Sequence, residues 1–221
     1  MSLILAISTS STLFEVMIGD NSTVLFSDSY VLSITDKKDI SVLVAESLEK
    51  MNLTPQDIKS IMVDVGPGGT SLVRTGVAFG NGLAYSLGIP ICPVLSVELV
   101  GIEVWEKYKL PVVITVKSVK DSAYVALYEG KLKALKYGIM TEVVGEIVAD
   151  FSEFVVAGAH QDKIIAEFPN KKVHDSGVLH GNPKYLIEKH DSFKDQYVSF
   201  PQFAHPITEQ TTHIAGNTPS V

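Results

Sequence analysis

The sequence predicts an α/β protein with two lobes, and three observations support this. Short apolar runs rich in β-branched residues alternate with stretches whose apolar residues recur at helical spacing. The chain opens with three consecutive strands before helices and strands alternate, and this order begins again, more loosely, after Pro111. We therefore expect a first lobe over residues 1–108, a smaller and more divergent lobe over 109–200, and an extended or disordered tail over 201–221.

The first lobe should contain a three-stranded meander followed by alternating helices and strands. Strands are expected at residues 3–7, 14–18, 23–29, 61–65 and 91–95, and helices at 39–51, 71–87 and 97–107. Thr54 and Pro55 are typical of the start of one further, short helix, because a hydroxyl caps it and proline suits its first position. Gly88 and Pro90 end the helix at 71–87.

The second lobe repeats this order with weaker signals. Strands are expected at residues 112–116, 123–128, 131–139 and 154–157, and helical stretches at 164–168 and 185–190. The repeat lies in the order of the elements, since the two halves share no clear sequence similarity.

The composition excludes several classes of protein. Of the 221 residues, 46% are apolar and 19% charged, which is typical of a globular chain, and the net charge of -7 argues against a surface that wraps nucleic acid. Cys92 is the single cysteine, so the chain cannot form an internal disulfide. The N-terminal apolar run lacks a preceding positive charge, and no apolar run approaches the roughly 20 residues that span a bilayer. We expect a cytoplasmic protein without a membrane segment.

A glycine-rich turn, Gly66-Pro67-Gly68-Gly69, follows a predicted strand and leads into a helix that Thr70 can cap. Backbone amides at such a turn point forward without side chains in the way, so they can bind an anion. The phosphate-binding loop of nucleotide hydrolases requires a lysine that is absent here, and the dinucleotide fingerprint requires glycine where Ser71 stands. The residues leave open an anion site formed by Gly66, Gly68, Gly69 and Thr70, or a purely structural turn.

The helix after this turn carries small residues at regular spacing. Gly76, Gly80 and Ala84 recur every four residues. Glycine inside a helix costs about 1 kcal/mol relative to alanine, so its repetition indicates that another backbone approaches closely. The other backbone belongs either to the same lobe or to a second subunit, and the sequence favours neither. Arg74 is either a surface charge or a contact to an acidic partner.

Other chemistry-bearing residues form weaker patterns. The hydroxyls of Ser8 to Ser11 are interpreted as a turn between strands, Cys92 as a core thiol and Asp64 as a buried acid. No G-x-S-x-G motif indicates a serine hydrolase, and no spacing among the histidines indicates a metal site. The histidines, which we expect in loops, are His160, His174, His180, His190, His205 and His213.

Several of these segments resemble the bacterial TsaB (YeaZ) family. Residues 3–10, LILAISTS, are similar to its opening ILAIDTS, and residues 66–76, GPGGTSLVRTG, are similar to its GPGSFTGLRIG. The likeness continues to Ser96, and residues 124–128 resemble its EVYxxxY strand. It covers about the first hundred residues well and is faint afterwards.

The resemblance implies two ribonuclease H-like lobes of the actin, Hsp70 and sugar-kinase type. It also implies a role in making N6-threonylcarbamoyladenosine at position 37 of tRNA, as an accessory subunit and not as the transferase. The implied partners are a TsaD-type catalytic subunit and a TsaE-type ATPase, with a homodimer when the chain is alone and tRNA contacted only indirectly. No cofactor is implied for the chain itself, although ATP or ADP could bind at the interface with its partner.

The chain departs from the family at several positions. Ser8 replaces an aspartate, Leu72 replaces a glycine, and Lys117 and Val119 replace an aspartate and an arginine. The tail lacks the family's P-x-Y-L-R ending. The chain is therefore identified as a divergent member, or as a paralogue that kept the scaffold and lost the original partner.

These observations together predict a non-catalytic scaffold subunit whose first-lobe helices contact the partner. The predicted contact residues are Ile40, Leu43, Val44 and Ser47 on the first helix, and Arg74, Gly76, Val77, Gly80 and Ala84 on the second. One alternative is a small-molecule kinase or ATPase that uses the turn from Gly66 to Gly69. A peptidase of the M22 class, an older description of such sequences, is the other alternative, and no catalytic residues support it.

Overall fold

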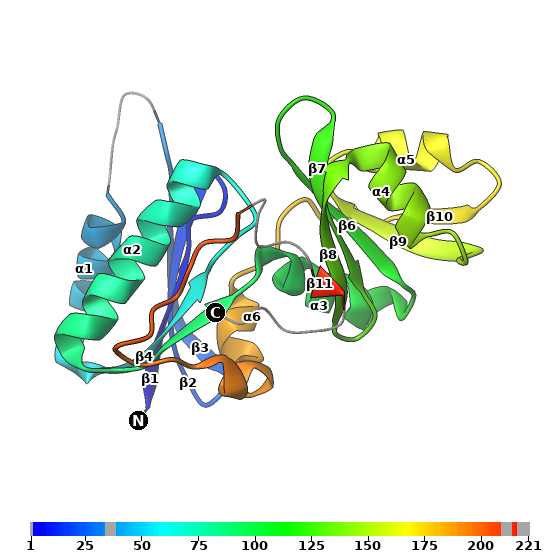
Figure 1. Ribbon diagram of the computed structural model, residues 1–221. Helices are drawn as coiled ribbons and strands as arrows, with labels where there is room; N and C mark the ends of the chain where they lie inside the picture. Colours follow the sequence, from blue (N-terminus) through cyan, green and yellow to red (C-terminus); the bar gives the residue numbers. More distant parts are fainter. Residues whose placement is uncertain (1, 34–38, 209–213, 216–221) are drawn as a thin grey trace. The chain divides into compact units, whose positions relative to one another are not determined.

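The computed structural model describes residues 2–33, 39–208 and 214–215. It divides into two compact units (Figure 1). Unit 1 comprises Met1–Leu95 and Pro183–Pro206, and unit 2 comprises Ser96–Asn182 and the described residues after Pro206.

Unit 1 is a five-stranded mixed sheet with helices on both faces. In chain order its elements are β1 (Leu3–Ser8), β2 (Leu13–Asp20), β3 (Thr23–Val31), α1 (Ile40–Lys50), η1 (Pro55–Asp57), β4 (Ile58–Asp64), α2 (Thr70–Leu87), β5 (Ile91–Val94), α6 (Lys184–Glu188) and η2 (His190–Gln196). The strands lie in the order β3-β2-β1-β4-β5. The first three pair antiparallel, whereas β4 lies parallel to β1 and β5 parallel to β4. α1 and α2 cover one face of the sheet and α6 covers the other (Figure 1).

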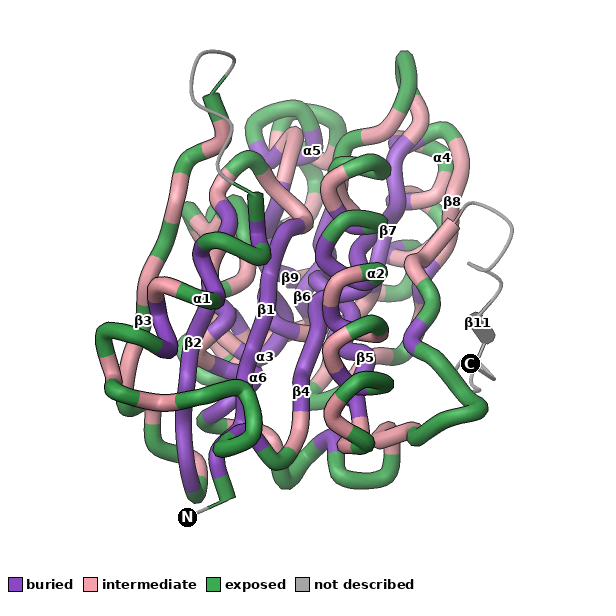
Figure 2. The backbone as a smooth tube through the Cα atoms, turned by 90° about the vertical axis from the view of Figure 1, so that its left-hand side faces the viewer, coloured by how far each residue is buried: buried purple, intermediate pink, exposed green. Residues whose placement is uncertain are grey.

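Burial within this sheet falls from the centre to the β3 edge. β1 is buried along its whole length, because apolar side chains on both of its faces meet helices. β3 instead alternates between exposed and intermediate residues, as Figure 2 shows. The continuous apolar run of β1 and the mixed composition of β3 are the sequence signals of these two environments.

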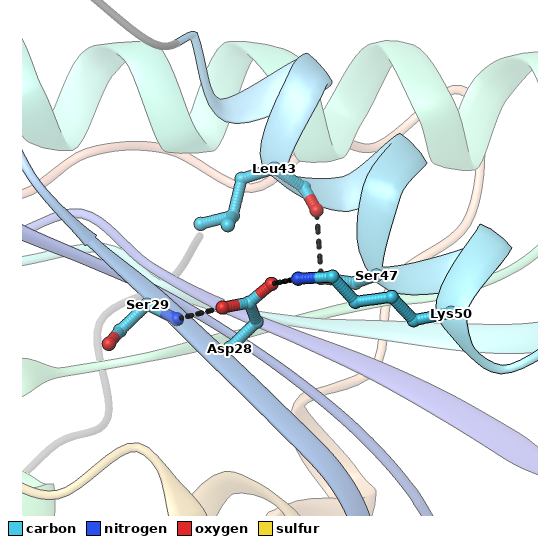
Figure 3. A network of polar contacts seen from close by, with 5 residues as sticks. All are labelled: Asp28, Ser29, Leu43, Ser47 and Lys50. Carbon is cyan, nitrogen blue, oxygen red and sulfur yellow. Dashed lines mark hydrogen bonds and ion pairs between the residues drawn. The ribbon is translucent and has the colours of Figure 1, made fainter. Parts of the chain in front are cut away.

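α1 is tied to β3 by polar contacts at its C-terminal end (Figure 3). Lys50 Nζ lies 2.5 Å from Asp28 Oδ2, and Asp28 Oδ1 accepts a hydrogen bond from the Ser29 amide at 2.9 Å. At the other end of the helix Asp39 accepts from the Ser41 amide, so the predicted helix start is confirmed as an N-cap.

Unit 2 has the same strand order with one added strand. Its elements are α3 (Ser96–Tyr108), β6 (Val112–Lys117), β7 (Ser122–Tyr128), β8 (Leu132–Ile139), α4 (Met140–Ile147), β9 (Glu153–Gly158), α5 (Gln161–Glu167), β10 (Lys172–Asp175) and β11 (Ile214–Ala215). The strands lie in the order β10-β9-β6-β7-β8-β11, with β6, β7 and β8 antiparallel and β9 and β10 parallel to β6. Both units therefore have the ribonuclease H-like arrangement, as the resemblance implied.

The unit boundaries differ from the predicted lobe boundaries. The helix α3 packs on β6, β7 and β9, and the Gly101 backbone lies directly against the Tyr128 ring, so unit 2 begins at Ser96. Residues 183–206 return to unit 1, where Leu186 and Ile187 of α6 are fully buried on its sheet. The prediction followed chain order, whereas burial of the apolar helix faces decides which sheet each segment joins.

The predicted elements all occur within a few residues of their expected bounds, and four further elements of the described chain, α4, β10, η2 and β11, were not predicted. The helix α4 starts directly after β8 and contains Gly145 and β-branched residues, so it lacks the usual helix signals. The strand β10 has only four residues, three of them polar. In the tail, β11 pairs antiparallel with β8, and residues 209–213 and 216–221 lie outside the described residues.

Candidate functional site

The glycine turn after β4 closes on the chain's own β1–β2 loop. The Gly66 amide donates to Asp64 Oδ1 at 2.9 Å, and the Gly69 amide donates to the Ser10 carbonyl at 2.9 Å. A Cβ atom on Gly68 would lie 2.3 Å from that carbonyl oxygen, and Gly66 has a φ of +89°. The turn needs glycine because another backbone lies against it and because one residue adopts a left-handed conformation.

Two hydroxyls at the end of β1 complete this junction. Ser8 Oγ donates to Asp64 Oδ2 at 3.0 Å, and Thr9 Oγ1 donates to the Leu72 carbonyl in the first turn of α2 at 2.7 Å. Thr9 is fully buried, and a Cβ on Gly76 would lie 2.3 Å from its hydroxyl. Asp64 is 2% exposed, so its prediction as a buried acid is confirmed.

Glu15 joins this cluster and was missed by the sequence reasoning. It lies opposite Ser8 in the β1–β2 pairing. Burial, and then the nearby Asp64 carboxylate, raise the pKa of Glu15 to about 7. An acid within the apolar strand β2 is the signal that could have identified it.

The surroundings of this turn are unfavourable for a phosphate. An anion would need free amides and positive charge, but the amides of Gly66 and Gly69 already donate within the chain. The Asp64 carboxylate lies directly behind the turn and Glu15 beside it, so the local field repels an anion. In this structure the turn is a packing junction between β1, β4 and α2.

The small residues of α2 that were predicted to form an interface face the sheet of their own unit. Gly76, Val77, Gly80 and Ala84 are all buried. A Cβ on Gly80 would lie 3.2 Å from Ile91 Cδ1. This is a correction: these residues allow α2 to approach the sheet closely and belong to the core of unit 1.

The predicted contact residues of α1 are corrected in the same way. Ile40 and Leu43 are 1% exposed, Val44 is 3% exposed, and Ser47 is fully buried. The Ser47 hydroxyl donates to the Leu43 carbonyl at 2.7 Å within the helix (Figure 3). Periodicity identifies the apolar side of a helix, which here is the side that packs on the sheet. Among the predicted contact residues on either helix, Arg74 is exposed.

The outer sides of α1 and α2 instead carry a different set of small, uncharged residues. We define the outer surface by the exposed residues Val42 and Ala45 of α1 and Ala78, Gly82 and Tyr85 of α2. The two helices contact each other, so these residues belong to one side of unit 1. A Cβ on Gly82 would meet no atom within 4 Å, so packing within the unit does not require this glycine.

Ser22, His190 and Asp191 form the arrangement that comes nearest to a hydrolytic triad in the described residues. His190 Nδ1 lies 3.2 Å from Ser22 Oγ, and its Nε2 lies 3.4 Å from Asp191 Oδ1. The same Nδ1 lies 3.0 Å from the Ile187 carbonyl, which can only accept, so Nδ1 carries a hydrogen and cannot take the serine proton. This geometry does not support a serine hydrolase.

The remaining histidines do not assemble a metal site in the described residues. No group of three or more histidine, cysteine, aspartate or glutamate side chains there has the spacing to hold a metal ion. His174 lies in β10 and not in a loop, where its Nε2 is 2.8 Å from Glu153 Oε1. His213 lies outside the described residues. Cys92 is fully buried, as predicted.

None of the helices in the described part of the chain combines the length and the apolar character that crossing a bilayer requires.

Comparisons with known proteins were made for the whole chain. The family model described as TsaD: tRNA N6-adenosine threonylcarbamoyltransferase matches residues 34–216. The tRNA threonylcarbamoyladenosine biosynthesis protein TsaB of Buchnera aphidicola is 27% identical over 66% of this chain and 69% of its own length. TsaB of Bacillus subtilis is 34% identical over 43% of this chain and 42% of its own length.

Other matches are shorter or more distant in sequence. The tRNA N6-adenosine threonylcarbamoyltransferase of Fusobacterium nucleatum is 40% identical over 28% of this chain and 18% of its own length. The first curated relatives are thus matched over less than half of their length, 16% to 42% for four of them. The solved structure of YeaZ from Pseudomonas aeruginosa has a TM-score of 0.76 at 19% identity, covering 94% of this chain and all of that chain, so the fold is the same.

Proposed function

We propose that this chain is a non-catalytic scaffold subunit for threonylcarbamoyl transfer to adenosine 37 of tRNA. The chain belongs to the TsaD family of the matching model and, within that family, to the TsaB/YeaZ members. The proposal combines the family's chemistry with two features of unit 1. The turn that a kinase or ATPase would use packs against the β1–β2 loop, and α2 beside it carries no charged residue after Arg74.

The observation that carries the proposal is the exposed glycine of α2. Gly82 lies inside a helix of 18 residues, where it costs about 1 kcal/mol relative to alanine, and no contact within the unit explains it. Ala78 lies one turn before it and Ala45 on the neighbouring helix. Small residues on an exposed helix allow a second helix to approach closely, which is what a stable subunit contact requires.

A TsaD-type catalytic subunit is the proposed occupant of the outer surface. Arg74, at the N-terminal end of this surface, is placed to meet an acidic side chain of the partner. When the chain is alone, a second copy would use the same surface and form a homodimer. A TsaE-type ATPase would join the assembly through the TsaD-type subunit, and tRNA would be contacted only indirectly.

The proposal also covers where a nucleotide would bind and where in the cell the protein would work. Because the Gly66 and Gly69 amides already donate within the chain, we expect ATP or ADP to bind at the interface with the partner and not to the isolated chain. A protein that acts on tRNA together with these subunits would work in the cytoplasm.

A pair of matched variants tests the outer surface. Ala78→Arg places a long charged side chain on the surface of α2, whereas Ala166→Arg makes the same change at an exposed residue of α5 in unit 2. We expect Ala78→Arg to weaken binding to a purified TsaD-type subunit from the same organism at least about ten-fold, measured by calorimetry, because it is bulky and buries an unpaired charge. Ala166→Arg should bind like the unaltered chain.

Two results would contradict the proposal. Equal binding by both variants would exclude the outer surface. If the tagged chain recovers no TsaD-type subunit, and depletion of the chain leaves the threonylcarbamoyl modification of tRNA unchanged, the scaffold function itself fails.

A further inference from the structure

The end of unit 1 forms an extended segment beside α2, which we call the strap (residues 198–206). Figure 1 shows it in orange to red, running alongside α2. Val198 exchanges two backbone hydrogen bonds with Ile91 of β5, at 2.8 and 2.9 Å. Further along, the Asn81 side chain donates to the Ala204 carbonyl at 2.8 Å and accepts from the Ala204 amide at 2.9 Å. The strap is thus fixed near both of its ends by paired hydrogen bonds.

Three aromatic side chains gather where the strap passes the last turns of α2. The Tyr85 and Phe200 rings have centroids 5.2 Å apart, and those of Phe200 and Phe203 are 6.0 Å apart. Tyr85 is 62% exposed, Phe200 65% and Phe203 37%. Single exposed apolar residues are ordinary, but a contiguous group of large ones is typical of a protein contact.

These rings surround a hollow of about 140 Å³, which Ala84 and Ser199 also line. Sites for drug-sized ligands and cofactors measure roughly 300–1,000 Å³, so a nucleotide does not fit in this hollow. Its volume is suited to one apolar or aromatic side chain. Because the paired bonds of Asn81 and Val198 hold the strap in place, little ordering is needed before such a side chain enters.

The hollow is continuous with the outer surface through Tyr85, which belongs to both. Between Arg74 and the end of α2 no residue is charged, so a partner lying along α2 would reach the hollow without meeting a charge on that helix. A second copy is a poorer occupant. The larger side chains of the outer surface that it would present are Val42 and Tyr85, and Tyr85 already lines that copy's own hollow. The others, Ala45, Ala78 and Gly82, are too small to fill it.

We propose that the hollow between Tyr85, Phe200 and Phe203 receives one apolar or aromatic side chain from the TsaD-type subunit. This inference rests on the proposed function and adds the anchor point of that contact. The partner would lie along α2 from Arg74 to Tyr85 and insert its anchor between α2 and the strap.

Calorimetric titration of the full-length chain with the purified TsaD-type subunit tests this inference. Tyr85→Ala and Phe200→Ala should each weaken binding about ten-fold or more, as is typical when an aromatic at the centre of an interface is removed. Their thermal midpoints should stay close to that of the unaltered chain, because both side chains are mostly exposed. Val31→Ala and Leu179→Ala, at apolar residues of similar exposure on β3 and in unit 2, are the matched controls and should bind normally.

The outcomes separate this inference from the proposed function. If both aromatic variants bind normally while Ala78→Arg does not, the hollow is not the anchor and the proposed function stands. If Ala78→Arg also binds normally, the proposed contact surface fails as well. If the aromatic variants lose self-association, measured by light scattering, but keep their affinity for the TsaD-type subunit, a second copy is the occupant and the inference is overturned.

Discussion

The two units build the same junction from different sequences. In unit 1 the Gly69 amide donates to the Ser10 carbonyl, and in unit 2 the Ala159 amide donates to the Thr115 carbonyl at 2.7 Å. A buried threonine hydroxyl at the end of the first strand closes each junction: Thr9 donates to Leu72, and Thr115 donates to the carbonyl of Ala159.

Each junction also contains a glycine in a left-handed conformation. Gly66 has a φ of +89° and Gly158 a φ of +82°. Because the same geometry occurs where no glycine-rich motif is present, the turn of unit 1 is explained by the crossover from β4 to α2 alone. Likeness to a phosphate-binding loop is therefore weak evidence for a ligand when the fold repeats the turn elsewhere.

The units differ most in the helices that follow these junctions. α2 has 18 residues and α5 has seven, and α1 has 11 residues and α4 has eight. In the longer pair, α2 carries no charged residue after Arg74, whereas α5 contains Asp162, Lys163 and Glu167. Unit 1 is therefore the unit that we expect to carry the subunit contact.

The largest expected effect concerns the junction of unit 2. In Gly158→Ala the new Cβ would lie 2.1 Å from the Thr115 carbonyl oxygen, in addition to the strain of a positive φ. We expect the free energy of unfolding to fall by at least about 3 kcal/mol, measured by chemical denaturation. Gly177→Ala is the control, because it has a φ of +70° but no atom within 4 Å, and it should lose about 1 kcal/mol. Similar losses for both variants would show that close packing at the junction contributes little.

A second comparison uses two glycines on opposite sides of α2. Gly80→Leu would press a side chain against Ile91 and Val63, so we expect a loss of roughly 2–3 kcal/mol in the free energy of unfolding. Gly82→Leu points into open space and should stabilise the chain by about 0.5–1 kcal/mol while weakening binding to the TsaD-type subunit. Thermal unfolding measures the opposite effects of the two variants on stability, and calorimetry measures their binding to the TsaD-type subunit. Equal stability of the two variants would contradict the orientation of α2.

A third expected effect is a pH dependence that comes from Glu15 in β2 of unit 1, whereas β7, the corresponding strand of unit 2, carries no acidic residue. Glu15 has a pKa of about 7 in the folded chain, against 4.5 as its ordinary value. The folded state therefore keeps this proton while the unfolded state loses it, so the contribution of Glu15 to stability falls as the pH rises from about 4.5 to about 7. With allowance for solvent screening, we expect the free energy of unfolding to fall by roughly 1–2 kcal/mol over this pH range.

Glu15→Gln removes this titration and should flatten the corresponding part of the stability curve. Denaturation midpoints measured at intervals from pH 4.5 to 8 would check it. An unchanged slope in the variant would assign the pH dependence to other groups.

Much of the fold could be predicted because apolar periodicity and turn residues are local signals. β1 is recognisable from its unbroken apolar run, and the start of α1 from Asp39. The helix α4 and the strand β10 were missed because one lacks helix signals and the other is short and polar. The return of residues 183–206 to unit 1 was also missed, since it depends on contacts between residues far apart in the chain.

For the candidate site, the sequence predicted contact residues on the sides of α1 and α2 that the structure buries against the sheet. Gly76, Gly80 and Ala84 were recognised as positions of close approach, and one of the two interpretations left open, packing within the lobe, is what the structure contains. Phe203 was placed in the extended or disordered tail and Phe200 at the end of the second lobe, and sequence alone gives no partner for either. Phe200 and Phe203 pack beside Tyr85 because the hydrogen bonds between Asn81 and Ala204 hold the strap against α2.

The sequence by itself determined the class of fold, its internal repeat and the family resemblance, because these follow from local patterns of apolar residues, glycines and caps. Only the tertiary structure decided which side of α2 is open and what the glycine turn contacts. Those answers depend on which surfaces meet when the sheet and its helices pack, and close packing is a property of residues that are distant in the chain.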